Sequence, residues 1–381
     1  MATKRVAVES IGSYFESLTD PRDTRNRRHQ FLDIVVLAVC GVVCGCDGPT
    51  AVRRWAVARA EWLRGFLELP NGIPSRDCIR NLLMAVQPEA FQKCFQQWIA
   101  AALATDGTAR RLVAIDGKTL RRSHDAAHGL GPLHIVSAWA IEHGIALGQV
   151  ATEETSNEIT AIPVLLQQIE LKKAVVTIDA MGCQKDVARD IVAAGGDFVI
   201  ALKDNQPKLA AAIATVVEKH LGGEFEALKH RNHQTDTRGH GRRDERFYWV
   251  AQVPPDFAAK EEWPWIKAIG TAVRITTHPD GTQTDEVRYY MLSRFVSGTR
   301  FGEAVRGHWG IESMHWVLDV TFGEDQTRTR QRILANNLSW LRRFAITLLK
   351  RHPEKDSIRG KMIRCLMDTA FLDEVLTLQG N

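Results

Sequence analysis

The sequence lacks the cysteine pattern of a disulfide framework or of a structural zinc site. Its 381 residues include seven cysteines, an odd number, and none of them forms a C-x-x-C pair. Cys40 and Cys44 lie one helical turn apart in an apolar run, which indicates small core residues. We therefore expect a protein that stays reduced in the cytoplasm.

The sequence also lacks a secretory signal and a run long enough to cross a membrane. The opening residues, MATKRVAVESIG, have no apolar segment after their basic residues. The longest apolar run, residues 31–46, contains Asp33 and is too short to span a bilayer. It predicts a buried helix, and no membrane partner is expected.

Neither sign of charge is in large excess, since 49 basic residues face 45 acidic ones and the net charge is +4. Evidence for nucleic-acid binding therefore has to come from local clusters of basic residues. Residues 20–29 read DPRDTRNRRH, with one acidic residue after the first arginine, and this is typical of a solvated loop or of a set of phosphate contacts. Residues 325–351 contain seven basic residues and one acidic residue.

The apolar pattern divides the chain into five parts. Residues 1–105 predict a helical N-terminal domain with a DNA-binding role. Residues 106–215 and 301–351 predict the two parts of an α/β core, the second ending in a basic helix. Residues 216–300 are charged and rich in turns, and they predict a β-rich insertion with a hairpin at HPDGTQ. Residues 352–381 are expected to form a C-terminal tail.

The first part of the core predicts a mixed five-stranded sheet with flanking helices. Short apolar segments predict strands at residues 112–118, 133–140, 146–152, 174–180 and 197–203. Helical segments precede each of the last two strands. The resulting order, β-β-β-α-β-α-β, is a meander that leads into parallel crossover units.

Two of the predicted strands end on an aspartate, Asp116 in LVAIDGK and Asp179 in VVTIDAMG. Carboxylates at strand ends face the edge of the sheet where ligands bind in α/β folds. The small residues that follow, Gly117 and Gly182 among them, leave room for a ligand near the backbone. One such aspartate is ordinarily a turn residue or a helix cap, but a matched pair favours a site. Oxygen ligands without cysteine suit Mg²⁺ or Mn²⁺ better than zinc.

A third carboxylate is expected from residues 308–325, HWGIESMHWVLDVTFGED. On a helix, His308, Glu312, His315 and Asp319 share one face, with the glutamate between the histidines. Residues 324 and 325 follow a glycine and are expected beyond the helix. Two alternatives remain on spacing alone. One is a zinc site, since E-x-x-H occurs at metal sites on bundle helices, although H-E-x-x-H is absent. The other is a polar helix face held by hydrogen bonds.

Along nearly its whole length the chain resembles the DDE transposases of bacterial insertion sequences, in the ISAs-type, H-repeat-associated group. The resemblance is carried, in chain order, by DPRDTRNRRH, LPNGIPSRD, AIDGKTLRRS, LHIVSAWA, SNEITAIPVLL, VTIDAMGCQK, LKDNQP, GHGRRDER and RGHWGIESMHWVLDVTFGED. It implies a ribonuclease-H-like core in which the first and fourth strands are neighbours. Asp116 would then lie beside Asp179, and Glu312 would arrive from a helix packed on the sheet.

The same resemblance implies the chemistry and the partners. Asp116, Asp179 and Glu312 would be the catalytic residues and would hold two Mg²⁺ (or Mn²⁺) ions, which clamp the attacking and leaving oxygens of a phosphodiester. The substrate would be double-stranded DNA, cut at the transposon ends and joined to target DNA, with a dimer in the synaptic complex. The protein would work in the bacterial cytoplasm, associated with the nucleoid when bound to DNA.

Some positions depart from the family pattern. Related transposases carry Y-x-x-R-x-x-x-E-x-x-x-x-x-x-K around the glutamate. Here Val305, His308 and Asp319 stand at the tyrosine, arginine and lysine positions, so the roles of those three residues are not transferred. Asp204 stands where the related sequences carry glycine in LKGNQP.

The residues expected to contact DNA are mostly basic and lie near the expected site or in the clusters. They are Arg22, Arg25, Arg27, Arg28, Lys118, Arg121, Arg122, Lys203, Arg242, Arg306, His308, Trp309, Arg328 and Arg330. Trp309 and Trp316 are suited to stacking on an extruded base, but we expect at least one of them to pack in the core. Two other functions stay open: a nuclease or domesticated relative that cuts without joining, and a catalytically silent DNA-binding protein.

Overall fold

The structure is a computed structural model that describes residues 13–103, 111–152, 158–203, 205–221, 228–239 and 241–377. The boundary expected near residue 105 and the departure at Asp204 lie outside these ranges.

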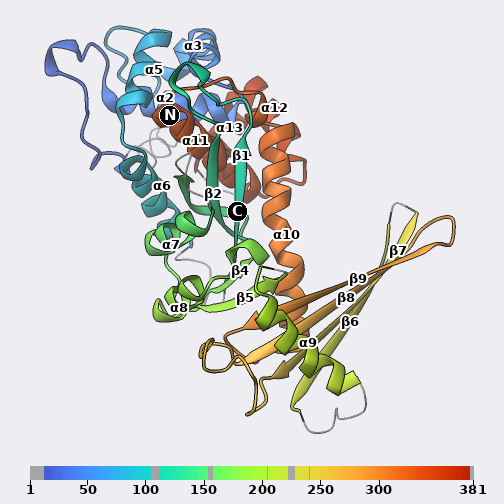
Figure 1. The fold of residues 1–381 in the computed structure, drawn as a ribbon. Coiled ribbons are helices and arrows are strands. Elements are labelled where there is room, and N and C mark those ends of the chain that lie inside the picture. Colours follow the sequence, from blue (N-terminus) through green and yellow to red (C-terminus); the bar gives the residue numbers. More distant parts are fainter. Residues whose placement is uncertain are drawn as a thin grey trace.

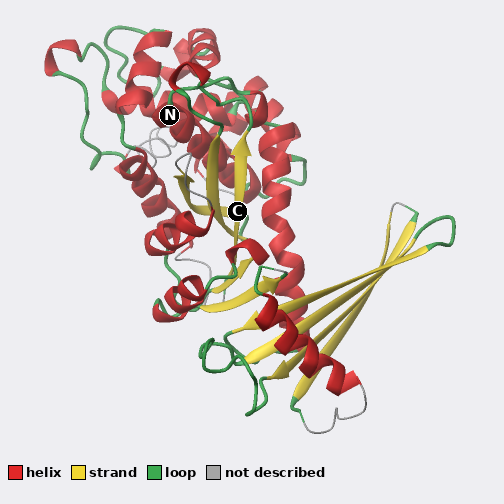
Figure 2. Cartoon of the chain, viewed as in Figure 1, coloured by secondary structure: helices red, strands yellow, loops and turns green. Residues whose placement is uncertain are grey.

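A nine-stranded mixed sheet runs through the molecule (Figures 1 and 2), in the order β3-β2-β1-β4-β5-β9-β8-β7-β6. Its first five strands form the core and match the predicted series. They are β1 (Leu112–Leu120), β2 (Leu133–Ala140), β3 (Ile145–Thr152), β4 (Val175–Ile178) and β5 (Asp197–Leu202). β1 pairs antiparallel with β2 and parallel with β4, and β4 pairs parallel with β5. The first and fourth strands are therefore neighbours, as expected.

The β-rich insertion continues this sheet and does not form a separate one. Its strands are β6 (His230–Gly239), β7 (Arg242–Gln252), β8 (Ala268–Thr277) and β9 (Gln283–Leu292), all antiparallel to their neighbours. β9 also pairs antiparallel with β5, so the free edge of the core is covered. The predicted hairpin at HPDGTQ is confirmed as the β8–β9 turn. In Figure 1 the far ends of these strands project away from the helical part of the molecule.

Helices cover the core and make up the N-terminal part. They are α2 (Phe31–Val43), α3 (Pro49–Ala58), α4 (Ala60–Leu63), α5 (Arg76–Ala85), α6 (Pro88–Leu103), α7 (Glu158–Gln168), α8 (Lys185–Ala193), α9 (Pro207–Leu221), α10 (Gly298–Val320), α11 (Arg332–Arg351), α12 (Ile358–Met367) and α13 (Thr369–Thr377). Ser156 and Asn157, which have side chains suited to capping the start of α7, lie outside the described residues. The expected C-terminal tail contains two helices, α12 and α13, which pack on α11.

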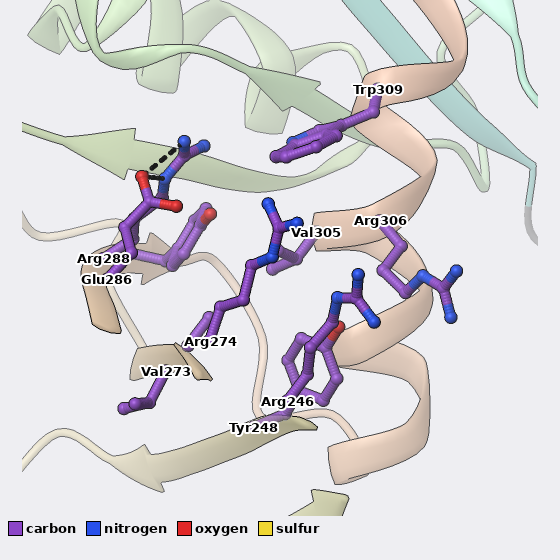
Figure 3. Close-up of a pocket in the computed structure, with 11 residues that line it drawn as sticks. Arg246, Tyr248, Val273, Arg274, Glu286, Arg288, Val305, Arg306 and Trp309 are labelled. Carbon is purple, nitrogen blue, oxygen red and sulfur yellow. Dashed lines mark hydrogen bonds and ion pairs between the residues drawn. The ribbon is translucent and has the colours of Figure 1, made fainter. Parts of the chain in front are cut away.

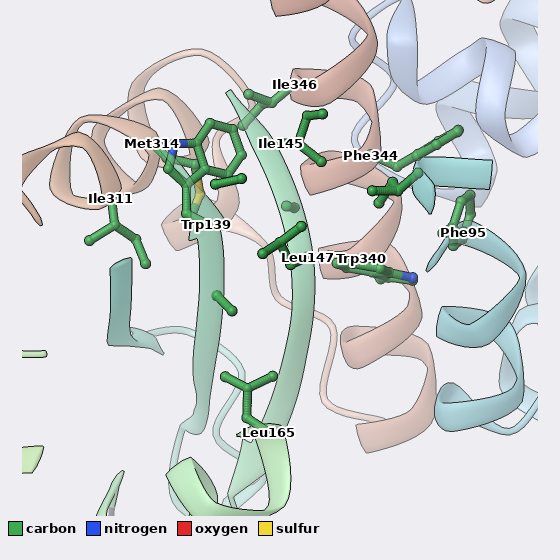
Figure 4. Packing of buried hydrophobic residues seen from close by; sticks show 14 of the residues in the cluster. Phe95, Trp139, Ile145, Leu147, Leu165, Ile311, Met314, Trp340, Phe344 and Ile346 are labelled. Atoms are coloured by element: carbon green, nitrogen blue, oxygen red, sulfur yellow. The ribbon is translucent and has the colours of Figure 1, made fainter. Parts of the chain in front are cut away.

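The main core lies where α11 packs between β3 and the N-terminal helices (Figure 4). The rings of Phe344 and Phe95 lie 4.3 Å apart, and Phe344 meets Trp98 edge-on at 4.8 Å. α2 is buried along almost its whole length, as its apolar sequence predicted. None of the helices in the described ranges is long and apolar enough to cross a membrane.

The 23-residue helix α10 links the core to the insertion (Figure 1). It begins after Ser297, whose side chain accepts a hydrogen bond from the Arg300 N–H and so caps the helix. From there it contacts β6, β7 and β8 and then passes β4 and β1. The residues on its later turns are therefore held against the two strands that carry the predicted aspartates.

Candidate active site

The register of two strands places Asp116 and Asp179 side by side. The parallel pairing of β1 with β4 ends at Ile115 opposite Ile178, so the next residue on each chain is an aspartate. Asp179 follows the end of β4, as predicted. Asp116 does not end its strand, because β1 continues to Leu120 through its pairing with β2. The prediction of two strand-end aspartates is thus correct for Asp179 and wrong for Asp116.

Asp179 is oriented by the backbone that follows it. Its Oδ1 accepts hydrogen bonds from the N–H groups of Met181 (3.0 Å) and Gly182 (3.3 Å), in the short 3₁₀ turn Ala180–Gly182. Burial raises the pKa of Asp179 despite the Gly182 hydrogen bond, and the nearby charges of Glu158 and Asp116 raise it further. A bound cation would stabilise the ionised form of this carboxylate.

Helix α10 turns one polar face towards these strands, as its spacing predicted. His308 Nδ1 lies 3.2 Å from Thr177 Oγ1 on β4, and His315 Nδ1 lies 3.4 Å from Asp116 Oδ2. Glu312 lies between the two histidines, is exposed, and lines a cleft that also contains Asp179.

The electrostatic surroundings of His308 include all three predicted carboxylates. Burial lowers the pKa of the His308 imidazole and favours its neutral form. The charges that oppose this shift most strongly are those of Asp116, Asp179 and Glu312. Within the described part of the chain, no lysine or arginine forms an ion pair with any of these three carboxylates.

The chemistry of these three side chains suits a hard divalent cation, but their spacing in the structure does not yet form a metal site. All three offer oxygen ligands and, among the described residues, none is paired with a lysine or arginine, which suits Mg²⁺ or Mn²⁺. Among the described residues, however, no three His, Cys, Asp or Glu side chains are close enough together to hold a metal ion as they stand. Side-chain adjustment would have to accompany metal binding. The cysteines play no part, because six of the seven are buried and Cys78 is partly buried.

A fourth carboxylate, Glu158, lies at the same place and was missed in the sequence. Its Oε1 lies 3.0 Å from His134 Nε2, and His134 Nδ1 lies 2.8 Å from Thr119 Oγ1. The charge of Glu158 raises the pKa of Asp179 more than the charge of Asp116 does. Only its place in the motif SNEITAIPVLL could have drawn attention to it.

The small residues beside the aspartates make room for protein side chains. A Cβ at Gly117 would overlap the Glu158 carboxylate and the His134 ring, and one at Gly182 would overlap Ile178. The expectation that these glycines leave open space for a ligand is therefore wrong, because α7 and β2 fill the space beside Gly117.

Lys118, expected to contact DNA, is instead buried among carboxylates. Its Nζ lies 2.7 Å from Asp319, 2.8 Å from Asp325 and 3.7 Å from Glu324. Its ammonium is thus occupied within the protein, where it ties β1 to the end of α10. Asp319, at the family's lysine position, is one of its partners.

Behind Lys118 lies a buried ion cluster. Glu324 is fully buried and lies 3.3 Å from Arg343 Nη1 and 3.6 Å from Arg342 Nη1. It also accepts a hydrogen bond from Ser339 at 2.8 Å. Both arginines belong to α11, so this basic helix does not present them to DNA as the charge count suggested.

The N-terminal arginine loop is partly structural. Arg22 donates to both oxygens of Asp20 and to the His29 carbonyl, so it holds the loop together. Its expected phosphate contact is therefore replaced by an internal one. The other three arginines of the loop are exposed: Arg25, Arg27 and Arg28.

Most of the remaining predicted DNA contacts lie at the surface. The exposed ones are Arg121, Arg122, Lys203, Arg242, Arg306, Trp309, Arg328 and Arg330. His308 is the exception, since it is half-buried against Thr177. Trp309 and Trp316 keep 39% and 61% of their surface exposed, so the expectation that at least one packs in the core is wrong.

Family models and known proteins match this chain, some of them along almost its whole length. The family model "Transposase DDE domain" matches residues 107–348, and "DDE_Tnp_1-associated" matches residues 13–99. "Putative transposase YncI" of Escherichia coli O157:H7 is 36% identical over 97% of this chain and 95% of its own length. "H repeat-associated putative transposase YhhI" of Escherichia coli strain K12 is 33% identical over 98% of this chain and 99% of its own. The chain therefore belongs to the DDE transposase family and is an insertion-sequence transposase of the H-repeat-associated type.

Proposed function

We propose that Asp116, Asp179 and Glu312 are the catalytic carboxylates with which this transposase cuts transposon ends and joins them to target DNA. The observation that carries the proposal is that Glu312 of α10 lines the cleft that contains Asp179, while His315 of the same helix lies 3.4 Å from Asp116. We assign the five-stranded part of the sheet to a ribonuclease-H-like core, on the basis of its strand order and the family match.

The three carboxylates act together in this proposal. Asp116, Asp179 and Glu312 would together hold the Mg²⁺ or Mn²⁺ ions. When bound, the ions supply Lewis-acid stabilisation of the attacking and leaving oxygens of a phosphodiester. The N–H groups after Asp179 hold its carboxylate in place, and His315 lies against Asp116. Neutral His308 adds no positive charge that would compete with a cation.

The substrate side of the proposal follows from the family. Transposases act on DNA, and we propose double-stranded transposon ends and target DNA as the partners. Since two ends have to be cut and joined together, we propose a dimer in the synaptic complex. The place of action would be the bacterial cytoplasm, at the nucleoid.

Metal dependence is the first test. Purified protein, given a plasmid with the inverted repeats that flank its reading frame, is expected to cut at the repeats with Mg²⁺ or Mn²⁺. Cleavage should stop with EDTA, because the unpaired carboxylates alone cannot stabilise the leaving oxygen. Gel analysis reads cleavage and joined products separately, so a nuclease that cuts without joining would be recognised. Cleavage that survives chelation, or that zinc alone supports, would contradict the carboxylate assignment.

The exposed arginines of the N-terminal loop give a second test. Replacing Arg25, Arg27 or Arg28 with Ala is expected to weaken DNA binding. The slope of log K against log salt should flatten by up to about 0.9 for each phosphate that the variant no longer neutralises. Arg189→Ala on α8, which removes an exposed arginine paired with neighbouring aspartates, is the matched control. Equal slopes for the loop variants and the wild type would show that the loop is a solvated surface without phosphate contacts.

A further inference from the structure

A pocket between the insertion sheet and α10 collects four arginines (Figure 3). Arg246, Arg274 and Arg288 come from three adjacent strands, and Arg306 comes from the helix. One carboxylate, Glu286, also lines it. In Figure 3 the side chains of the strand arginines rise between the sheet and α10, and Trp309 lies beside them.

Two arginines of this pocket face each other across neighbouring strands, and Arg288 forms an ion pair with Glu286 at 2.6 Å. Arg246 lies directly opposite Arg274 on the neighbouring strand. Like charges in this position repel one another and destabilise a sheet. Both guanidiniums bind the same buried carboxylate, Asp244, at 3.0 Å and 2.9 Å. One negative charge therefore serves two positive ones, and the pair stays positive overall.

Asp244 stays ionised at neutral and mildly acidic pH and holds the two arginines in place. Burial alone would raise its pKa, but hydrogen bonds from Thr276 and Arg274 bring the pKa of Asp244 down to about 2. The carboxylate thus stays ionised and fixes the direction of both side chains. Arg306 differs, because within the described part of the chain no carboxylate pairs with it.

The pocket lies next to the candidate active site. The cleft that contains Asp179 and Glu312 shares Arg288 and Trp309 with it. The guanidiniums of Arg274 and Arg288 lie 5.8 Å and 5.6 Å from the Trp309 ring, so the indole borders the positive region. A strand that leaves the carboxylates along this cleft would bring its next phosphates to the arginines.

We infer that this arginine pocket binds a phosphate group of the DNA strand that continues from the catalytic carboxylates. The inference rests on the proposed function for the identity of the strand. Guanidinium groups suit phosphate because their N–H donors match its oxygens. A bound phosphate also offsets the repulsion between Arg246 and Arg274. The source of the group is either the 5′-phosphate at the cut or an internal phosphodiester of the same strand.

Binding without cleavage tests this inference. The probe is a mixed-sequence single-stranded oligonucleotide with a fluorescent 3′ label, prepared with a 5′-phosphate or a 5′-hydroxyl. Fluorescence anisotropy is measured in EDTA, so the result does not depend on catalysis. Arg274→Gln and Arg288→Gln are expected to weaken binding about tenfold, as the loss of a charge-assisted hydrogen bond would. Arg238→Gln, which removes the same charge from an exposed position on β6, is the matched control and should cost about twofold or less.

The two forms of the probe separate the two sources. A loss confined to the 5′-phosphorylated probe assigns the pocket to the terminal phosphate, and an equal loss with both probes assigns it to an internal phosphodiester. Losses no larger than that of Arg238→Gln would overturn the inference. If Arg274→Gln fails to fold, Arg306→Gln carries the test, because Arg306 is exposed on α10. Cleavage by the wild type is scored separately, so a failure of the proposed function remains distinguishable.

Discussion

Replacing Asp179 with Asn is expected to abolish cleavage of transposon-end DNA while leaving the DNA bound as tightly as before or more tightly. The change removes a metal-binding charge from a carboxylate that the Met181 and Gly182 N–H groups hold in place. Loss of Lewis-acid stabilisation worth several kcal/mol should slow the reaction by at least about a thousandfold. Binding should not suffer, because a negative charge near phosphate is removed.

Asp116→Asn and Glu312→Gln are expected to behave in the same way. Asp319→Asn is the matched control, since Asp319 lies on the same face of α10 and pairs with Lys118. It should retain measurable cleavage. Cleavage is measured on gels and DNA affinity by fluorescence anisotropy, with circular dichroism as a check on folding. Normal cutting by Glu312→Gln together with an inactive Asp319→Asn would show that the third carboxylate is misassigned. Loss of DNA binding in folded Asp179→Asn would point to a structural role.

Replacing Glu324 with Gln is expected to lower the free energy of unfolding by about 3–5 kcal/mol, the effect of removing one partner from a buried ion pair. The substitution keeps the size of the side chain but removes the carboxylate that forms ion pairs with the buried Arg342 and Arg343. Both arginines are almost fully inaccessible to water, so solvent cannot compensate. Chemical denaturation measures the change.

Asp325→Asn provides the control for this prediction. Asp325 also pairs with Lys118, but its side chain keeps 18% of its surface exposed, so a smaller loss is expected. Replacing Glu324 with Leu and Arg343 with Met together should recover part of the stability, because one buried arginine, Arg342, then lacks its partner instead of two. A Glu324→Gln variant as stable as the wild type would mean that the cluster contributes nothing to the fold.

The acid dependence of stability should change in the same variant. Burial alone would raise the pKa of Glu324, but Arg343 and Arg342 hold it below its ordinary value of 4.5. A carboxylate whose pKa is lower in the folded state stabilises the fold above its unfolded pKa and loses this effect as the pH falls through the folded value. The wild type should therefore lose stability below pH 4.5 more steeply than Glu324→Gln does.

The sequence by itself determined the succession of strands and helices along the core, the helical nature of the N-terminal part and the polar face of α10. These features follow from periodicity, which is a local property: apolar residues that alternate or recur every three to four positions leave few choices of element. The pairing of β1 with β4 came from the family resemblance, and so did the choice of Glu312 among the carboxylates of its stretch. Local pattern alone left zinc and a polar helix face as alternatives.

Only the tertiary structure decided what each charged residue meets. Lys118 and Arg343 resemble candidate phosphate contacts in the sequence. Both instead lie against Glu324, whose turn is distant from Lys118 along the chain. Glu158 lies beside Asp179, and Arg246 faces Arg274, through packing and strand register that no local pattern encodes. Periodicity shows which face of an element is polar. Whether that face meets solvent, a carboxylate or another arginine depends on which elements pack together, because burial and ion pairing are properties of the assembled neighbours.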